Sequence, residues 1–351
     1  MNNTLQTAVV ILNWNGRAFL ERFLPRLIEC SSTSLSTEII VADNASTDDS
    51  VDFMRKNYSQ IRLIINSENG GFAKGYNEAL KKVEAKYFVL LNSDIEVTPC
   101  WIEPVIELME SDSRIAAAQP KLLSFYDRKR FEYAGAGGGF IDFLGYPFCR
   151  GRIFQAVEED HGQYDDTCEI FWASGAALFV RSDLYLKHGG LDEDFFAHME
   201  EIDFCWRMKN LGYKIMYCPK STVYHIGGGT LPKSSALKTY LNFRNNLSLL
   251  YKNLPSARLR GVLFCRFFLD LTAAASFIVS TGLGEFYAVF QAYRDFIRLR
   301  PKNYRKRALL VQHKRVPQMY KKSLVFKYYL WRIKCFSSLK AKDFISSSIH
   351  R

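Results

Sequence analysis

The stretch FVLLNSDIEV, residues 88–97, decides the fold class of this chain of 351 residues. It begins as an unbroken apolar run, turns polar at Asn92, Ser93 and Asp94, and becomes apolar again at Ile95. An apolar run without alternation is typical of a strand buried on both faces, as in a parallel sheet between two layers of helices. In such sheets ligands bind beyond the carboxyl ends of the strands, which would explain a carboxylate at this position.

Earlier segments repeat this pattern. TAVVILNWN (7–15), EIIVADNAS (38–46) and IRLIIN (61–66) are strand-like runs, and segments with helical spacing or helix-start signals follow at 17–30, 48–58 and 75–83. Three strand–helix units in the first hundred residues predict an α/β fold with a mostly parallel sheet and helices on both faces.

Polar residues follow three of these strands, at 13–15, 43–44 and 92–94. Because the carboxyl ends of parallel strands meet at one edge of a sheet, the three clusters are expected to converge on one crevice. Asn, Asp and Ser are also the usual turn formers, which is the alternative explanation for any one cluster. Because all three clusters lie at equivalent strand ends, a common crevice is favoured over three independent turns.

Charge is distributed unevenly along the chain. From residue 241 onward there are 22 Lys or Arg and four Asp or Glu, a net charge of +18, whereas the first 240 residues carry 25 against 32, a net charge of −7. An acidic body with a basic tail indicates a catalytic domain held near an anionic partner, either nucleic acid or a phospholipid surface. Composition does not choose between the two.

Cysteine usage and the N-terminus bear on the compartment. The eight cysteines are scattered without a CxxC pair, which favours buried thiols in a reducing compartment over a disulfide framework or a zinc site. MNNTLQTAVVILNW has no positive charge ahead of its apolar run, so a signal peptide is not expected. The sequence therefore predicts a cytoplasmic protein.

The second hundred residues are less regular. Segment 124–148 is rich in glycine and aromatic residues and segment 158–169 is acidic, and both are expected to be loops over a shared pocket. Residues 198–213 predict a short helix closed by Gly212, and residues 214–229 predict a strand pair that ends at His225.

Seven motifs in order carry a family resemblance: ILNWNG (11–16), VADNASTDDS (41–50), ENGGFAKGYNEAL (68–80), LLNSD (90–94), SGAALFVRSDL (174–184), GGLDEDFFAHMEEIDFCWR (189–207) and VYHIGGGT (223–230). From about residue 8 to residue 254 the chain resembles the family 2 glycosyltransferases, in particular their bacterial rhamnosyltransferase-like branch. The resemblance implies a Rossmann-like GT-A nucleotide-sugar-binding domain over residues 1–254. It also implies the inverting transfer of a rhamnose-like or other hexosyl group from a nucleotide diphosphate sugar.

A diphosphate leaving group requires a divalent cation, and oxygen ligands with a histidine suit Mg²⁺ or Mn²⁺. By the resemblance, Asp94 is the metal ligand of the family's DxD motif, whose first Asp is Asn92 here. His225 matches the family's late histidine, which completes the metal shell or contacts the diphosphate. The alternative for His225 is a structural histidine at a strand end.

Donor binding is expected at the ends of the first strands and beyond. Asp43 can accept a hydrogen bond from a uracil or thymine ring, Trp14 offers an aromatic face, and Asn15 can bond the base or ribose. Lys74 is placed to meet the diphosphate or the sugar, and Gly71 lets the backbone approach the donor. The predicted donor-binding set is Trp14, Asn15, Asp43, Asn44, Gly71, Lys74, Asn92 and Arg244, the last as a diphosphate contact.

An inverting transfer needs a base that takes the proton from the acceptor hydroxyl. The resemblance aligns Glu200 and Glu201 with the family's acidic pair, whose second member is usually Asp, and makes Glu201 the base. Asp203 is expected to assist catalysis, or instead to pair with Arg207 four residues on. The alternative is that these acids only favour the positive end of a helix.

Residues 255–351 predict a basic, helical, membrane-associated region. Its longest uncharged run, 271–284, has 14 residues, short of the roughly 20 needed to span a bilayer. Helices lying in the interface of an anionic membrane surface are therefore favoured, and a plain helical core with a solvated basic end is the alternative.

The sequence thus predicts a metal-dependent glycosyltransferase, peripheral on the cytoplasmic face of the cell membrane. It would act in cell-envelope polysaccharide synthesis on a lipid-linked or other polysaccharide precursor, with no nucleic-acid partner. Two other classes stay open. A nucleotidyltransferase that makes activated sugars would need a phosphate-binding glycine loop after the first strand, which is missing. A non-catalytic sugar- or nucleic-acid-binding protein would not need Asp94, Glu201 and His225 together.

Overall fold

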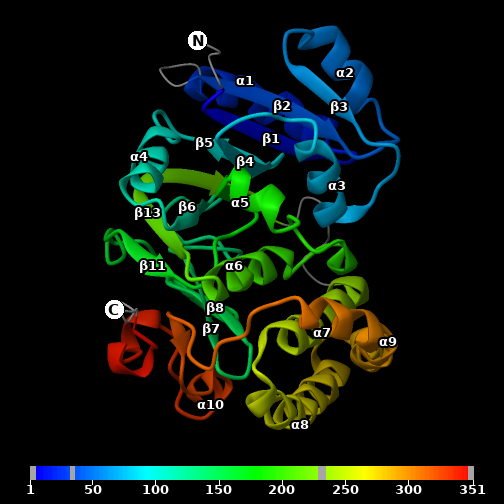
Figure 1. The fold of residues 1–351 in the computed structure, drawn as a ribbon, viewed down its shortest axis with the longest axis vertical. Coiled ribbons are helices and arrows are strands. Elements are labelled where there is room, and N and C mark those ends of the chain that lie inside the picture. Colours follow the sequence, from blue (N-terminus) through cyan, green and yellow to red (C-terminus); the bar gives the residue numbers. More distant parts are fainter. Residues whose placement is uncertain (1–4, 32–35, 228–234, 347–351) are drawn as a thin grey trace.

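The computed structural model describes residues 5–31, 36–227 and 235–346. Within them a nine-stranded mixed sheet forms the centre, in the order β11-β13-β6-β12-β4-β1-β2-β3 with β5 beside β13 (Figure 1). Its strands are β1 (Thr7–Asn13), β2 (Thr37–Asp43), β3 (Arg62–Ile65), β4 (Tyr87–Asn92), β5 (Ile95–Val97), β6 (Ile115–Ser124), β11 (Cys168–Ile170), β12 (Ala177–Arg181) and β13 (Lys214–His225). The first four strands are parallel to one another, as predicted.

Helices cover both faces of this sheet. One face packs against α1 (Arg17–Ser31), α2 (Ser50–Asn57) and α4 (Glu103–Ser111), the other against α3 (Gly71–Leu80), α5 (Ser182–Lys187) and α6 (Glu200–Asn210). Along β1, Val9 and Ile11 belong to the first of these cores and Ala8 and Val10 to the second. An unbroken apolar strand fills both cores because successive side chains point to opposite faces. The predicted fold class is confirmed.

The predicted loop at 124–148 is wrong in its second half. There the chain begins a five-stranded sheet, ordered β10-β9-β8-β7-β14. Its strands are β7 (Gly139–Asp142), β8 (Pro147–Cys149), β9 (Arg152–Ile153), β10 (Ala156–Val157) and β14 (Met319–Tyr320). Gly139 is required here, because a β-carbon on it would lie 2.1 Å from the ring of Trp172. The segment is thus rich in glycine for close packing, not for loop formation.

Residues 214–229 were predicted as a strand pair, but residues 214–225 form one long strand, β13. Its pairing with β6 shifts register between Cys218 and Thr222, so a bulge takes the place of the expected turn. At its carboxyl end His225 pairs with Ile95 of β5. This register places His225 beside the turn that follows β4.

The C-terminal region is helical and packs on the sheet domain. Its helices are α7 (Ala236–Asn253), α8 (Ser256–Ser280), α9 (Leu283–Ala308) and α10 (Leu324–Tyr329). Figure 1 shows α7, α8 and α9 grouped at one end of the molecule and the C-terminal segment beside β7 and β8. The domain division at residue 254 stays a prediction. Many contacts cross it, among them the packing of α7 against α9 and the pairing of β14 with β7.

Helix α8 has the length and composition of a membrane-crossing helix, with a mean hydropathy of 1.9 over its most apolar 18 residues. Only 22% of that window is buried, unlike the core helix of a soluble protein. The apolar side chains exposed on α8 and α9, here called the apolar tail surface, are Phe264, Phe267, Phe268, Leu271, Ile278, Val279, Leu283, Tyr287, Phe290 and Ile297.

Four of the eight cysteines, at 30, 149, 205 and 218, are buried as expected. Cys168 is half-buried, and Cys100, Cys265 and Cys335 are exposed. All eight are free thiols. The prediction that they do not form a disulfide framework is confirmed, whereas the prediction that they are buried holds for only half of them.

Candidate functional site

Asp94 and His225 meet at the edge of the sheet where β4 ends. The turn after Asn92 carries Asp94, whose carboxylate Oδ1 lies 3.1 Å from Nε2 of His225 at the end of β13. The amide nitrogen of Asn92 lies 3.4 Å from the same ring nitrogen. Asp94 and His225 are both buried. The two predicted metal residues, Asp94 and His225, are thus in contact, and the predicted donor residue Asn92 lies beside them. His225 is more than 130 positions further along the chain than the other two.

A third charged group, Glu132, was missed by the sequence reasoning. Its carboxylate Oε1 lies 3.4 Å from Nδ1 of His225, on the side of the ring away from Asp94. Glu132 is buried, and it arrives because its backbone N–H donates to the carbonyl of Leu122 in β6. An acid in a glycine-rich segment gives no sequence signal for this role, since only the pairing with β6 brings it near.

The histidine between these two carboxylates is electrostatically unusual. Burial alone would lower the pKa of His225, but the charges of Glu132 and Asp94 outweigh burial and raise it to about 10. Burial raises the pKa of Asp94, and the charge and hydrogen bond of His225 reverse this, so its pKa lies below the usual range. The carboxylate of Asp94 is therefore ionised at neutral pH.

Two predicted donor-binding residues, Asp43 and Asn44, lie beneath the surface. The carboxylate of Asp43 accepts hydrogen bonds from the Asn13 side chain at 3.0 Å and from the Ser46 backbone at 2.9 Å. The side-chain amide of Asn44 donates to the side chain of Asn69 and to the carbonyl of Gly71. Both side chains fix the loops at this edge, so the turn-former explanation accounts for much of their environment.

Other predicted donor residues are more accessible. Trp14 is 40% exposed, and the neighbouring Asn15 accepts from the Thr47 backbone with a positive φ of 50°. Lys74 lies in the first turn of α3, because that helix begins at Gly71, and its ammonium group pairs with Glu68. A hollow of about 330 Å³ opens beside Asn44 and Lys74.

Glu201, the predicted base, is half-buried at the start of α6, and its Oε2 atom is shielded from solvent. Its Oε2 has no hydrogen-bond partner among the described residues. Burial raises its pKa to about 7, and burial together with the charge of Glu201 raises the pKa of Glu200 well above its usual value. The other titratable groups in electrostatic contact with Glu201 are Cys205 of α6 and Cys149 of β8. A carboxyl group with a pKa near 7 can accept a proton efficiently at physiological pH.

The catalytic role expected for Asp203 stays a prediction. Asp203 is fully buried, and its carboxylate pairs with Arg207 at 2.9 Å and with Lys252 at 2.8 Å and accepts from Asn253. The alternative pairing with Arg207 is present. These three contacts anchor α6 to α7.

Arg244 lies in α7. It donates to the backbone carbonyls of Asp194 and Phe195 and to the side chain of Asn245. Its guanidinium thus contacts the loop that precedes α6, and the expected diphosphate contact stays a prediction.

The remaining site residues come together around one short segment, residues 174–176. The backbone N–H of Asn92 donates to the carbonyl of Ala176 at 3.0 Å. A β-carbon on Gly175 would lie 3.8 Å from Cβ of Glu201 and 3.1 Å from the ring of Phe72 in α3. Three parts of the site therefore meet at this segment: the end of β4 next to Asp94, the first turn of α3, and the predicted base Glu201.

Comparison with known proteins agrees with this arrangement. Residues 8–161 match the family model described as "Glycosyl transferase family 2". A curated relative, the N-acetylglucosaminyl-diphospho-decaprenol L-rhamnosyltransferase of Mycobacterium tuberculosis, is 25% identical over 236 residues, which cover 62% of this chain and 75% of the relative. The resemblance to the rhamnosyltransferase-like branch of family 2 is confirmed.

Solved structures share the fold. GalNAc-T7 with UDP, GalNAc and Mn²⁺ superposes with a TM-score of 0.58 at 14% identity over 91% of this chain, which spans only 60% of that longer protein. S. aureus TarS 1–349 in complex with UDP-GlcNAc gives a TM-score of 0.55 at 15% identity, with 86% of this chain and 87% of TarS covered. The GT-A fold is thereby confirmed.

Proposed function

We propose that this chain, a family 2 glycosyltransferase that uses a nucleotide sugar, transfers a rhamnose-like or other hexosyl group with inversion to a lipid-linked saccharide precursor. One observation carries the proposal. Residues 174–176 contact both the strand end beside Asp94 and His225 and the half-buried Glu201, whose Oε2 has no hydrogen-bond partner among the described residues. A pair suited to a diphosphate-bound cation and a base with a raised pKa are the two parts that inverting transfer requires.

The residues present fit a divalent cation. Among the described residues no group of three or more His, Cys, Asp or Glu could hold a metal alone. Mg²⁺ and similar ions are, however, commonly held by one or two protein ligands together with substrate phosphates. Asp94 and Nε2 of His225 supply two such ligands, and Glu132 on Nδ1 fixes the ring so that Nε2 faces Asp94. When bound, the cation would neutralise charge that develops on the departing diphosphate.

Glu201 performs the proton transfer in this mechanism. Its carboxylate takes the proton from the acceptor hydroxyl while that oxygen forms a bond to the anomeric carbon. The bond from that carbon to the diphosphate oxygen breaks, and the electron pair leaves with the nucleoside diphosphate. The Oε2 atom of Glu201 is shielded from solvent, which favours attack by the acceptor over hydrolysis of the donor.

The donor side is formed by the accessible residues of the β1 and α3 edge. Trp14 offers a ring face for the nucleobase and Asn15 a polar group for base or ribose. On donor binding, Lys74 exchanges its partner Glu68 for the diphosphate. Position 71 has no room for a larger residue than glycine, since a β-carbon there would lie 2.4 Å from the Phe196 carbonyl oxygen. The M. tuberculosis relative, named as acting on a diphospho-decaprenol saccharide, supports a lipid-linked acceptor.

The test of this function is nucleoside diphosphate release from a panel of activated sugars. The panel contains dTDP-rhamnose, UDP-glucose, UDP-galactose, UDP-N-acetylglucosamine and GDP-mannose, each with Mn²⁺, Mg²⁺ or chelator, with and without a polyprenyl-diphosphate saccharide. We expect release from one donor that requires both cation and acceptor. Binding of a nucleotide sugar without release under any condition would instead indicate a non-catalytic binding protein.

We further propose that the protein is peripheral on the inner face of the cell membrane through the apolar tail surface. This surface contains Val279, which is 92% exposed, and Phe264, which is 67% exposed. Two exposed basic residues of α9, Arg300 and Arg305, lie on the same pair of helices and suit anionic headgroups. A lipid-linked acceptor would be presented at such a surface.

Substituting Phe264, Phe268 and Val279 together by aspartate should lower binding to anionic vesicles by at least about tenfold. Each change removes apolar area that the membrane would bury and adds a charge of the same sign as the lipid headgroups. The measurement is co-sedimentation with phosphatidylglycerol-containing vesicles. Tyr126→Asp, which changes an exposed ring on the sheet domain, is the matched control. Unchanged sedimentation of the triple variant would refute the membrane proposal. Truncation is unsuitable, because Met319, Tyr320 and Leu324 belong to the core.

A further inference from the structure

Residues 192–199, in the connection between α5 and α6, have an unfavourable backbone conformation. Phe196, His198 and Met199 have φ values of 64°, 68° and 74°, in the left-handed region that residues with a β-carbon avoid. Several such residues in one loop persist only when surrounding contacts determine the conformation. The contacts that hold this loop are therefore informative about its role.

Helix α7 holds the loop through its backbone carbonyls. The side-chain amide of Asn245, which is fully buried, donates to the carbonyls of Phe195, Ala197 and His198 at 2.8–2.9 Å. Arg244 donates to the carbonyls of Asp194 and Phe195. Two successive side chains of α7 thus bond to four carbonyls of the strained segment.

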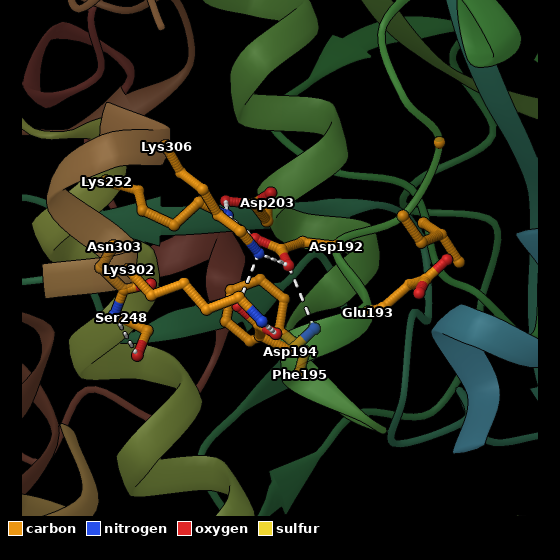
Figure 2. A network of polar contacts seen from close by, with 12 residues as sticks. Asp192, Glu193, Asp194, Phe195, Asp203, Ser248, Lys252, Lys302, Asn303 and Lys306 are labelled. Atoms are coloured by element: carbon orange, nitrogen blue, oxygen red, sulfur yellow. Dashed lines mark hydrogen bonds and ion pairs between the residues drawn. The ribbon is translucent and has the colours of Figure 1, made fainter. Parts of the chain in front are cut away.

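Lysines of helix α9 hold the loop by pairing with two carboxylates of the loop, as Figure 2 shows. The ammonium group of Lys306 bridges Asp192 and Asp194, and Lys302 pairs with Asp194 as well. Lys252 of α7 joins Asp192 to the buried Asp203 of α6. The network therefore connects both C-terminal helices to the loop and to the helix that carries Glu201.

The loop in turn contacts both halves of the candidate site. The carbonyl of Phe196 accepts from the backbone N–H groups of Phe72 and Ala73, in the first turn of α3 that also carries Lys74. At its other end the loop runs directly into Glu200 and Glu201 of α6. A displacement of the loop would consequently move the base and the donor helix relative to each other.

We propose that helices α7 and α9 act as a clamp that fixes loop 192–199, with Lys306 as a positioning residue for the Glu201 base and the first turn of α3. The proposal rests on the proposed function, because it assigns a role to contacts around the same site. Lys306 touches neither Glu201 nor α3, so its effect is transmitted through Asp192, Asp194 and the loop backbone. The C-terminal region is then required for catalysis as well as for membrane attachment.

The test compares three substitutions in α9. Lys306→Ala removes the bridge, Lys306→Arg retains a cation with comparable reach, and Arg298→Ala removes a charge that pairs only with Asp295 of the same helix. We expect Lys306→Ala to lower kcat by at least about tenfold, since small misplacements of reacting groups are costly. Its kcat should begin to rise at a lower pH than in the wild type, because a loosened loop admits water to Glu201. Lys306→Arg should recover most of the activity.

Two further measurements test the clamp without depending on enzyme turnover. Hydrogen exchange of the amides in residues 192–199 should be faster in Lys306→Ala than in Arg298→Ala, at an unchanged melting temperature. NMR titration of ¹³C-labelled glutamate carboxyl groups should show a lower pKa for Glu201 in Lys306→Ala. Equal exchange and equal titration in the two variants would overturn the proposal, as would faster exchange with unchanged kcat and pH profile. Absence of donor turnover in the wild type would refute the proposed function while these two measurements still decide on the clamp.

Discussion

Replacing Asp94 by alanine is expected to lower kcat by about 10²–10³-fold, because removal of one group that stabilises a developing charge typically has an effect of this size. Among the described residues, Asp94 is the anionic member of the pair proposed to hold a cation at this edge, and His225 is the other. Without Asp94 the site keeps only a histidine of this pair, and a single imidazole holds a hard divalent cation poorly. The loss should therefore persist at high Mn²⁺ concentration.

The measurement for Asp94→Ala is Mn²⁺ binding by electron paramagnetic resonance in the presence of nucleoside diphosphate, together with kcat. Asp94→Asn keeps the shape of the side chain and separates loss of the charge from loss of packing. Asp52→Ala, which changes an exposed acid of α2, is the control and should bind and react like the wild type. Turnover of Asp94→Ala near the wild-type rate at saturating Mn²⁺ would refute the metal assignment.

The sheet could be predicted from the sequence because its information is local. Each of the first strands is an apolar run whose alternate residues fill two cores, and each is followed within a few residues by a helix. The polar clusters at the strand ends follow from the same pattern, so Asp94 and Asn92 could be placed at the edge. The second sheet could not be predicted, since β14 joins β7 from 177 positions further along the chain.

The candidate site was predictable only where a motif carries it. Asp94, His225 and Glu201 lie in motifs whose order is distinctive, and the structure connects them through residues 174–176. Asp203 and Arg244 belong to equally regular segments, yet their partners are a lysine of α7 and backbone carbonyls of a distant loop. Long-range pairing of this kind has no local signature, because ion pairs and amide contacts can form at any sequence separation.

Replacing Glu201 by glutamine should reduce kcat by about 10²–10⁴-fold, the contribution of a positioned general base, while donor binding stays intact. Glutamine has nearly the same shape and cannot accept the proton. Glu201 is half-buried and its Oε2 has no hydrogen-bond partner among the described residues, so the site should accommodate the amide and the variant is expected to fold. Nucleotide-sugar affinity measured by calorimetry should therefore equal that of the wild type, in contrast to Asp94→Ala with cation present.

The pH dependence gives an independent test of the base. Because burial raises the pKa of Glu201 to about 7, the fraction of enzyme with a deprotonated base grows as pH rises through 7, and kcat should rise over the same interval. In Glu201→Gln the residual activity should lose this dependence. Glu107→Gln, on the exposed side of α4, should retain both the rate and the profile. Glu201→Asp, one methylene shorter, should retain partial activity. A normal rate and profile in Glu201→Gln would transfer the role of base to its buried neighbour Glu200, because the carboxylate of Asp203 is fully buried and held by Arg207, Lys252 and Asn253.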